Sequence, residues 1–221
     1  RILGDDGMQG RATGSMGETR AAHYIASELE RLGIRPLGSH RTFFQPIPMH
    51  GSTVLPESSL QIFDAQSDLL LELKLGVDYA LFKAGAQTYV PSPIPIAFVG
   101  FGIVAPEYDY NDYQGLDVRG KIVVFLSGEP VSDDLDFFGG PAPTIHGYAE
   151  SKQRIAMARG AQGSILIPNP ESVTSRQWSD WYRQFSFEDV TLAYAPTSTL
   201  SVVINPDRAR ILFDDAPYSL D

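Results

Sequence analysis

The sequence predicts an α+β fold in which short strands outnumber helices. Three features indicate this class: one strongly amphipathic helix near the start, short apolar runs bounded by glycine and proline, and one strand–helix–strand unit. The 221 residues are 43% hydrophobic and 20% charged, which is an ordinary globular composition. A chain of this length can bury a sizeable core without crosslinks, and it has no cysteine.

The clearest predicted element is a helix over residues 15–33. Ser15 and Glu18 form a capping box, which satisfies two backbone N–H groups at the helix start. Apolar residues recur at three-and-four spacing and form one stripe: Ala21, Ala22, Ile25, Leu29 and Leu32. Gly33 and Pro36 end the helix. Because a single helix cannot bury its own stripe, this one needs a partner surface.

The next part of the chain predicts strands. Residues 42–49 contain two prolines and predict an extended or edge segment. Residues 60–62 and 71–75 alternate apolar and polar side chains, which is typical of half-buried strands. The short apolar runs at 94–99 and 122–126 predict strands that are buried on both faces.

A strand–helix–strand unit follows. Residues 148–159 predict a helix that ends at Gly160, and residues 164–167 predict a strand. The spacing from the strand at 122–126 is long enough for a crossover, so the two strands are expected to be parallel. Beyond a further strand at 200–204, Asn205 and Pro206 predict the first turn of a last helix that runs to about residue 213.

Both tryptophans lie in residues 176–189, where polar side chains surround them and predict an exposed excursion. Trp178, Trp181 and Tyr182 are therefore the candidate contact residues of the chain. Exposed aromatic side chains can anchor a peptide or carbohydrate ligand, and they can equally make a contact with another domain.

Two glycine-containing motifs resemble nucleotide-binding loops but lack what those loops need. Residues 115–121 end the phosphate-loop pattern without a Ser or Thr hydroxyl, and Lys121 opens a strand rather than a helix. This stretch therefore predicts a polar turn in which Gly120 adopts a positive φ. Residues 100–105 fit a dinucleotide fingerprint, but Pro106 breaks the helix that would hold a pyrophosphate, so these glycines predict a bend or a close backbone approach.

Metal and nucleophile patterns point to no catalytic centre. The histidines occur in four separate segments without ligand spacing, and each is expected to be solvated: His23, His40, His50 and His146. An acidic loop could hold calcium, but it lacks the register of a dedicated calcium loop, so a solvated turn is favoured: Glu129, Asp133, Asp134 and Asp136. Neither G-x-S-x-G nor S-x-x-K is present. The sequence therefore predicts no catalytic and no metal-ligating residue in this chain.

The net charge limits the classes of partner that the chain can bind. The net charge is −10, which disfavours nucleic acid and anionic membranes because both require a basic surface. No apolar run approaches the 18 residues of a membrane span. The chain begins at Arg1 without a basic-then-apolar leader, so we expect any targeting peptide to have been removed.

Several motifs resemble one enzyme family. Three stretches are similar to the opening of secreted dinuclear-zinc aminopeptidases, the family of aminopeptidase Y and glutamate carboxypeptidase: residues 10–18, 21–26 and 32–38. Residues 44–48 are similar to the strand that follows in those enzymes. Three further stretches resemble their inserted protease-associated domain: residues 98–106, 113–124 and 152–167.

The resemblance implies a protease-associated domain of the swivelling β/β/α type, a short-stranded β-sandwich or open barrel with flanking helices, preceded by an isolated amphipathic helix. It implies that residues 1–40 belong to the peptidase domain, that residues 41–215 form the protease-associated domain, and that residues 216–221 begin a linker. In that family the zinc ligands lie in a catalytic domain after the inserted one, and none of their motifs has a match here. We therefore expect no cofactor in this chain and two zinc ions in the absent catalytic domain.

The leading hypothesis is a non-catalytic domain of a zinc-dependent aminopeptidase that shapes substrate access or mediates interdomain contacts. Its partners would be its own peptidase domain and a peptide or protein substrate, in a secreted or periplasmic location. The alternative is a free-standing peptide- or carbohydrate-binding module that uses the three aromatic residues named above. A third hypothesis, an enzyme with a dispersed site, has no motif in its support.

Overall fold

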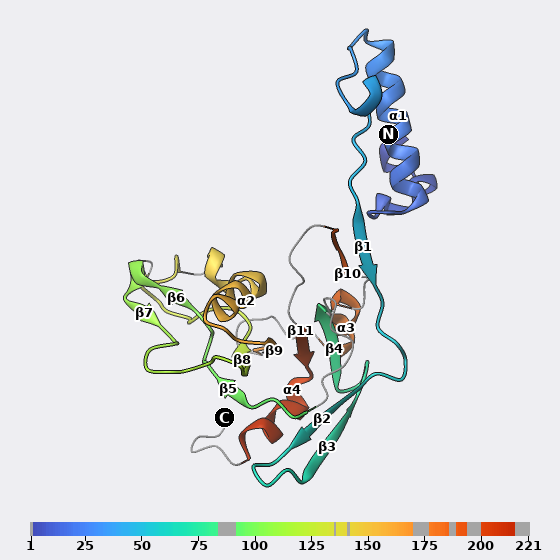
Figure 1. Ribbon diagram of the computed structural model, residues 1–221. Coiled ribbons are helices and arrows are strands. Elements are labelled where there is room, and N and C mark those ends of the chain that lie inside the picture. The colour runs from blue at the N-terminus through green and yellow to red at the C-terminus, as the bar shows by residue number, and fades with distance from the viewer. Residues whose placement is uncertain are drawn as a thin grey trace. The chain divides into compact units, whose positions relative to one another are not determined.

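The computed structural model describes residues 2–83, 92–134, 136–140, 142–169, 177–185, 189–193 and 200–214. The chain divides into two compact units. We call Arg1–Gly51 with Val190–Ala195 the N-terminal unit, and Ser52–Asp189 with Pro196–Asp221 the sheet unit. Helices and strands are mixed, with several sheets and few helices, as the α+β class predicts (Figure 1). The assignment of residues 1–40 to a peptidase domain stays a prediction, and residues 216–221 lie outside the described residues.

The N-terminal unit is built around helix α1 (Met16–Arg31). The predicted cap at Ser15 is present, because the Glu18 N–H donates to Ser15 Oγ at 3.2 Å. The return bond differs from a capping box: the Glu18 carboxylate accepts from the Gly14 N–H at 2.5 Å, while the Ser15 N–H donates to the Ala12 carbonyl. Two short 3-10 helices precede α1 and a third follows it: η1 (Ile2–Gly4), η2 (Asp6–Arg11) and η3 (Ser39–Arg41). Strand β1 (Met49–Ser52) pairs with β10 (Asp189–Leu192) in a two-stranded sheet.

The apolar stripe of α1 is only partly covered within its own unit. Ala21 is buried, whereas Ile25 and Leu32 are 46% and 63% exposed. A hollow of about 200 Å³ remains along this face, lined by Ala22, Ile25, Ala26, Leu29, Phe43 and Phe44. The segment at 42–48 is irregular rather than a strand, and β1 begins at Met49.

The sheet unit contains a five-stranded sheet. Its order is β4 (Tyr79–Lys83), β11 (Leu200–Ile204), β9 (Gly163–Ile167), β8 (Ile122–Leu126) and β5 (Ile96–Phe98). The last four strands are parallel and β4 is antiparallel at one edge. The predicted crossover is confirmed, because helix α2 (Ala149–Ala158) joins β8 to β9 and these strands pair in parallel from Ile122 and Gly163 onwards.

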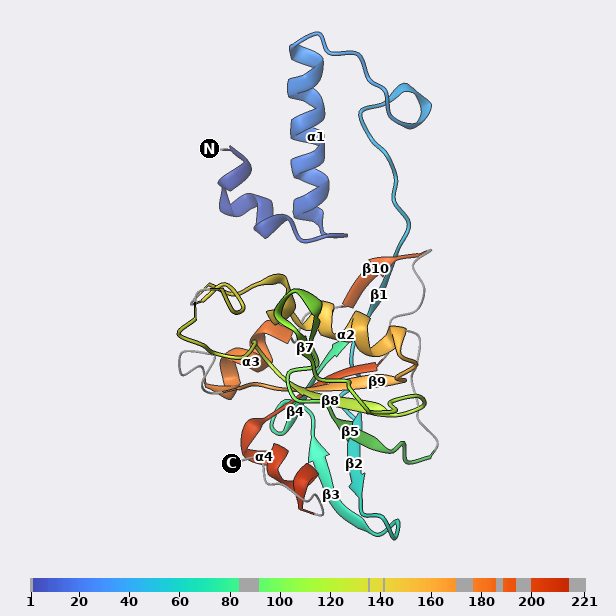
Figure 2. The same cartoon turned by 90° about the vertical axis from the view of Figure 1, so that its left-hand side faces the viewer.

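Two layers cover the faces of this sheet (Figure 2). Helices α2 and α3 (Trp178–Phe185) lie on one face, where Val123, Phe125 and Leu166 form the core with Ala156. The hairpin of β2 (Ser59–Phe63) and β3 (Leu69–Lys74) and the helix α4 (Pro206–Ala209) lie on the other face. Alternate residues of β8 therefore enter different cores, as the period of a strand requires.

Strand β5 is less buried than the sequence predicts. Ile96 and Phe98 are each 42% exposed, so the expectation of a strand buried on both faces at 94–99 is wrong there. The reason is its position, because β5 is an edge strand of the sheet and has a neighbour, β8, on one side only. The strand at 122–126, in contrast, is buried as expected.

The glycine-containing motifs behave as bends rather than nucleotide loops. Gly100 and Gly102 both have positive φ, and a Cβ at Gly102 would lie 3.1 Å from Phe125 Cβ. The small sheet of β6 (Val104–Ala105) and β7 (Tyr110–Asn111) follows, joined by the 3-10 helix η4 (Pro106–Tyr108). Gly120 has φ +71° in a turn before β8, which confirms the predicted turn.

The helix predicted from residue 205 to about residue 213 is present as two short helices. Asn205 Oδ1 accepts from the Asp207 N–H at 3.1 Å at the start of α4, and the 3-10 helix η6 (Arg210–Phe213) continues it. Another 3-10 helix, η5 (Ile145–Gly147), leads into α2. Among the described residues, none of the helices combines the length and apolarity that crossing a membrane requires.

Candidate functional site

The strands β5, β8, β9 and β11 are parallel, so their carboxyl ends lie at one edge of the sheet. In open sheets with parallel strands, ligands bind at this edge. The residues that follow these strands there are Val99, Ser127, Pro168 and Asn205. We call this region the carboxyl edge, and its polar side chains decide what the sheet unit can do.

The predicted aromatic residues lie on α3, and the prediction of an exposed excursion at 176–189 is wrong for the part that is described. Trp181 is only 9% exposed and stacks on Phe185, with ring centroids 5.7 Å apart. Trp178 and Tyr182 are half-buried. The spacing of Trp178, Trp181 and Phe185 is that of one helix face, which is the signal that the polar residues between them obscured.

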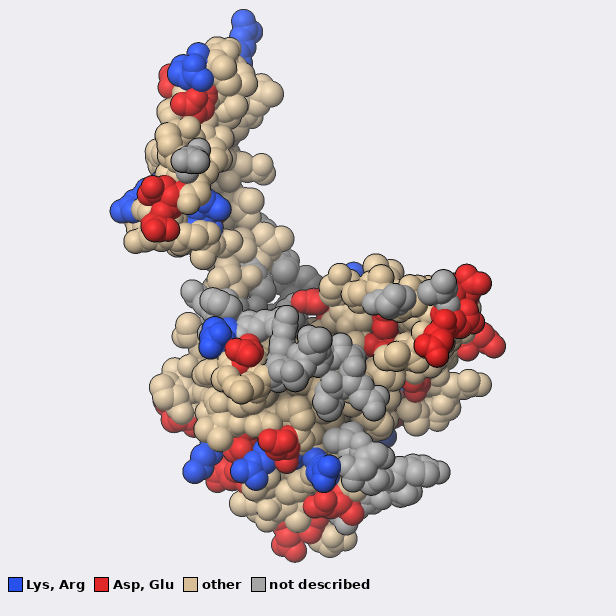
Figure 3. Space-filling model, turned by 180° about the vertical axis from the view of Figure 1, so that it is seen from behind, with Lys and Arg blue, Asp and Glu red and all other residues tan. Residues whose placement is uncertain are grey.

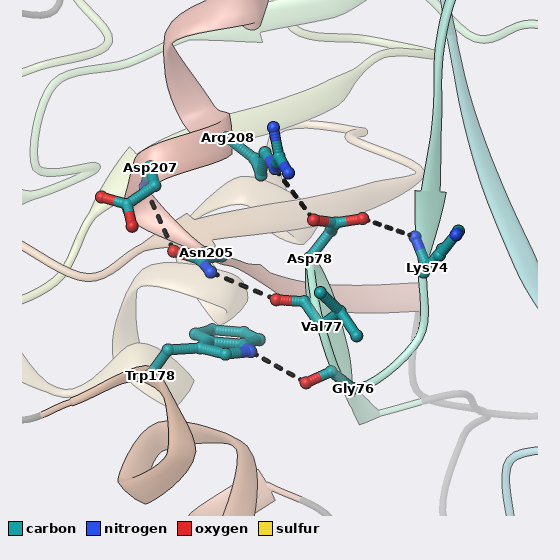
Figure 4. Close-up of polar contacts among 8 residues, drawn as sticks. All are labelled: Lys74, Gly76, Val77, Asp78, Trp178, Asn205, Asp207 and Arg208. Carbon is teal, nitrogen blue, oxygen red and sulfur yellow. Dashed lines mark hydrogen bonds and ion pairs between the residues drawn. The ribbon is translucent and has the colours of Figure 1, made fainter.

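Trp178 ties α3 to the carboxyl edge. Its Nε1–H donates to the Gly76 carbonyl at 2.9 Å (Figure 4). The ring of Tyr182 lies against the same turn, since a Cβ at Gly76 would be 3.3 Å from Tyr182 Cζ. These contacts hold the turn between β3 and β4, and a ligand-binding or interdomain role for the aromatic side chains stays a prediction.

Asp78 is the centre of that turn. Its buried carboxylate accepts from the Lys74 N–H at 2.9 Å and pairs with Arg208 Nε at 2.9 Å (Figure 4). Asn205 donates through its backbone N–H to the Asp78 carbonyl and through its side chain to the Val77 carbonyl. Asn205 therefore caps α4 and holds the β3–β4 turn with the same side chain.

Lys152 is the second polar centre of the carboxyl edge, and sequence reasoning missed it. This residue lies in the first turns of α2 and is completely buried. Its Nζ donates to the carbonyls of Leu126 (2.8 Å) and Gly128, and the rings of Phe101 and Phe125 lie 5.5 and 5.8 Å away. Burial lowers the pKa of Lys152 to about 7, against the opposing effect of nearby carboxylates.

The two carboxylates near Lys152 are occupied by hydrogen-bond donors. Asp112 accepts from the Ile103 N–H and from the Tyr110 hydroxyl, at 2.9 and 2.8 Å. Glu129 accepts from the N–H and the hydroxyl of Thr144, at 2.8 and 2.6 Å. Burial and the Asp112 carboxylate raise the pKa of Tyr110. These groups therefore fix the loops beside Lys152 rather than offering a free base.

The acidic loop does not gather into a cation site in the described structure. Glu129 is buried and engaged with Thr144, while Asp134 accepts from the Asp136 N–H at 3.0 Å in a local turn. Among the residues that the structure describes, no three His, Asp or Glu side chains lie close enough to hold a metal ion.

His146 is the exception to the expectation of solvated histidines. Its side chain is mostly buried, its Nε2 lies 2.7 Å from Glu107 Oε1, and its ring packs edge-on against those of Tyr108 and Phe138. The partners are 39 residues apart in the sequence, so no local pattern could have revealed the pair. His146 joins the loop before α2 to the small β6–β7 sheet.

The polar side chains of the carboxyl edge hold the loops of the sheet unit in place. Ser127, a buried hydroxyl at the end of β8, accepts from the Asn169 N–H at 2.8 Å and so links the loops after β8 and β9. Trp178 and Tyr182 lie at the β4 side of the sheet, whereas Lys152 lies beside β8. The structure thus does not assemble the predicted aromatic residues and the ionisable groups into one site.

Comparisons with known proteins give a limited picture. No family model matches the chain, and no curated protein matches it. The aminopeptidase from Aneurinibacillus sp. strain AM-1 is similar in structure, with a TM-score of 0.40 and 17% identity over 96% of this chain. BSAP, a zinc aminopeptidase from Bacillus subtilis, has a TM-score of 0.35 and 16% identity over 91% of it. This chain spans 40% and 36% of their lengths, and at these scores the similarity carries no inference about activity.

Proposed function

We propose that the chain is a non-catalytic protease-associated module of a zinc aminopeptidase, which shapes substrate access or mediates contacts with the peptidase domain. One observation carries the proposal: the motifs divide between the two units. Residues 10–18, 21–26 and 32–38 lie in the N-terminal unit, whereas residues 98–106, 113–124 and 152–167 lie in the sheet unit. There they contribute the end of β5, the first part of β8, most of α2 and the whole of β9. This division into two units supports the proposal that the two parts of the resemblance belong to two domains.

The packing of each unit supports these roles. In the sheet unit, polar groups at the carboxyl edge are engaged in holding turns and loops, as Asp78 and Lys152 illustrate. In the N-terminal unit, Ile25 and Leu32 leave apolar surface in water, at a cost of roughly 25 cal/mol per Å². A peptidase domain that covers this stripe would remove that cost. The two zinc ions would belong to that domain, in a secreted or periplasmic enzyme.

The free-standing binding module is the weaker alternative. It rested on exposed aromatic side chains at 178–182, and the described helix α3 packs them against the sheet unit instead. A peptide or carbohydrate would have to displace Trp178 from the Gly76 carbonyl to use its ring edge.

Metal content and hydrolysis of the purified chain test the non-catalytic part. We expect no stoichiometric zinc by elemental analysis and no release of nitroaniline from leucine p-nitroanilide after zinc is added. Tight zinc together with hydrolysis would overturn the proposal.

A matched pair of substitutions on α1 tests the partner. Ile25→Glu places a charge on the stripe, whereas Ser27→Glu adds the same charge at an exposed position of the same helix. We expect Ile25→Glu to abolish co-purification with a zinc peptidase domain from the same genome and Ser27→Glu to leave it intact. Equal retention by both variants would remove α1 from the proposed interface.

A further inference from the structure

Arg159, at the C-terminal end of α2, has a guanidinium with no acceptor among the described residues. Its Cζ lies 4.8 Å from the centroid of the Tyr113 ring, and it takes part in no described ion pair or side-chain hydrogen bond. Arg208 and Arg183 are paired with Asp78 and Asp180, and the described arginines without an ion pair include exposed ones, such as Arg35, whereas Arg159 is half-buried. A half-buried cation over an aromatic ring and without a counter-ion needs an explanation.

Arg159 lines a solvent-open hollow of about 410 Å³, which is formed with the turn before β8. The lining residues are Gly115, Leu116, Asp117, Val118, Arg119 and Arg159. The side chain of Leu116 is 48% exposed and gives the hollow an apolar wall. The Gly120 N–H donates to the Gly160 carbonyl at 2.9 Å, so the turn is fastened to the end of α2.

The charges at the hollow leave Arg159 uncompensated. Arg119 binds Asp117 through two N–H···O bonds of 3.0 Å each, and these bonds lower the pKa of Asp117 to about 2. The two charges of that pair cancel, while Lys121 adds a further positive charge beside the turn. The chain as a whole carries −10, and on the face drawn in Figure 3 acidic side chains gather at one margin of the sheet unit. A local positive hollow is therefore a departure from the general charge of the molecule.

We propose that this hollow binds a peptide carboxylate, with Arg159 as the carboxylate-binding residue and Leu116 as the contact for the neighbouring apolar side chain. A guanidinium offers parallel N–H donors that fit a carboxylate in a bidentate manner, and such charge-assisted bonds are stronger than neutral ones. The Tyr113 ring on one side of Arg159 replaces water by an apolar surface, which strengthens a bond made on its open side. The inference does not depend on the proposed function, because it rests on residues of the sheet unit alone.

The test is a titration followed by ¹H–¹⁵N NMR of the whole chain. Three probes are compared: the blocked peptide acetyl-Leu-Glu methylamide, its acetyl-Leu-Gln counterpart, and inorganic phosphate. We expect the glutamate peptide alone to shift the amides of Gly115, Leu116 and Val118 and the Arg159 side-chain signal. The glutamine peptide differs only in the carboxylate, so it isolates the proposed contact.

Variants on α2 complete the design. Arg159→Gln should weaken binding of the glutamate peptide at least tenfold, and Arg159→Lys should weaken it less because the charge remains without the planar donor pair. Arg154→Gln is the matched control, since Arg154 is exposed on the same helix and donates within it. Equal shifts with both peptides, unchanged binding in Arg159→Gln, or shifts with phosphate but not with the glutamate peptide would each overturn the proposal.

Discussion

The helices α1 and α2 have similar sequence signals but differ in how much of their surface is buried. Both end at a glycine with positive φ, and α1 has the more regular apolar stripe and the better cap. Yet α1 buries only Gly17 and Ala21, whereas α2 buries a lysine, a glutamine and an alanine beside a parallel sheet. Burial thus depends on whether the chain supplies a surface to pack against, and an amphipathic pattern alone does not supply one.

Hydrogen exchange should show the largest difference between the two units. Amides of residues 20–32 in α1 lack a fully covering core, whereas those of 122–126 lie in the centre of the sheet. We expect α1 to exchange through openings of low free energy and β8 close to the global unfolding limit, a difference of orders of magnitude in protection. Equal protection in a dilute monomer would make α1 an integral part of one fold.

A Leu→Ala substitution in each unit compares the burial of α1 and of the sheet core through the free energy of unfolding. Leu166→Ala removes a buried side chain that packs in the core with Ala156 of α2, and we expect a loss of about 3 kcal/mol. Leu29→Ala removes the same atoms from the partly open face of α1, with an expected loss below about 1 kcal/mol. Urea unfolding followed by tryptophan fluorescence reports the sheet unit, which holds both tryptophans, and far-ultraviolet circular dichroism reports the loss of helix α1. Similar losses would show that α1 is buried in solution.

The buried amine of α2 predicts a pH dependence. The pKa of Lys152 is about 7 in the folded chain, whereas the ordinary value for a lysine is 10.5. Between these two pH values the unfolded chain therefore binds more protons than the folded chain. The free energy of unfolding therefore rises with pH, by about 2–3 kcal/mol between pH 7 and 9.5. Well below pH 7 both states carry the proton, so the contribution of Lys152 to the slope vanishes there.

Lys152→Met should remove that slope, and Lys74→Met, at an exposed lysine of β3, should retain it. The window stays below pH 10, where the tyrosines begin to titrate. A slope that persists in Lys152→Met would assign it to another group.

Sequence reasoning succeeded where a signal is local. The cap at Ser15 and the stop at Gly160 are set by neighbouring residues, and the parallel crossover from β8 to β9 follows from the length of the segment between the two strands. It failed at β5, because an edge position depends on strand order and not on the strand's own residues.

The polar centres could not have been predicted in the same way. Lys152 is a lysine in an ordinary helical pattern, and the carbonyls that bind its amine are those of Leu126 and Gly128, 26 and 24 residues away at the end of β8 and just after it. His146 meets Glu107 across a distance of 39 residues. Such pairs are created by tertiary packing, whereas the helical spacing of Trp178, Trp181 and Phe185 was present in the sequence and was overlooked.

Glycines with the same backbone conformation allow a local comparison. Gly120 and Gly33 have φ of +71° and +73°, and a Cβ at either would meet nothing within 4 Å. Alanine would therefore cost only the conformational strain, about 1 kcal/mol. We expect Gly120→Ala to lower the stability of the sheet unit by that amount, and Gly33→Ala to loosen the end of α1 while the tryptophan-detected transition stays unchanged. If Gly33→Ala also moves that transition, the units unfold together.

The smallest effect is expected at Tyr113, and its sign is the informative part. Tyr113 packs with Ala156 of α2 and is only 5% exposed, yet its hydroxyl has no partner among the described residues. Burial raises the pKa of this hydroxyl to about 12, as expected for a group removed from water. Since an unsatisfied buried hydroxyl costs free energy, Tyr113→Phe should stabilise the sheet unit by about 0.5–1 kcal/mol. Tyr24→Phe on the half-buried side of α1 is the control and should change stability by only a few tenths. A clear loss of stability in Tyr113→Phe would mean that the Tyr113 hydroxyl is hydrogen-bonded in solution, because only the removal of a hydrogen bond would make the variant less stable.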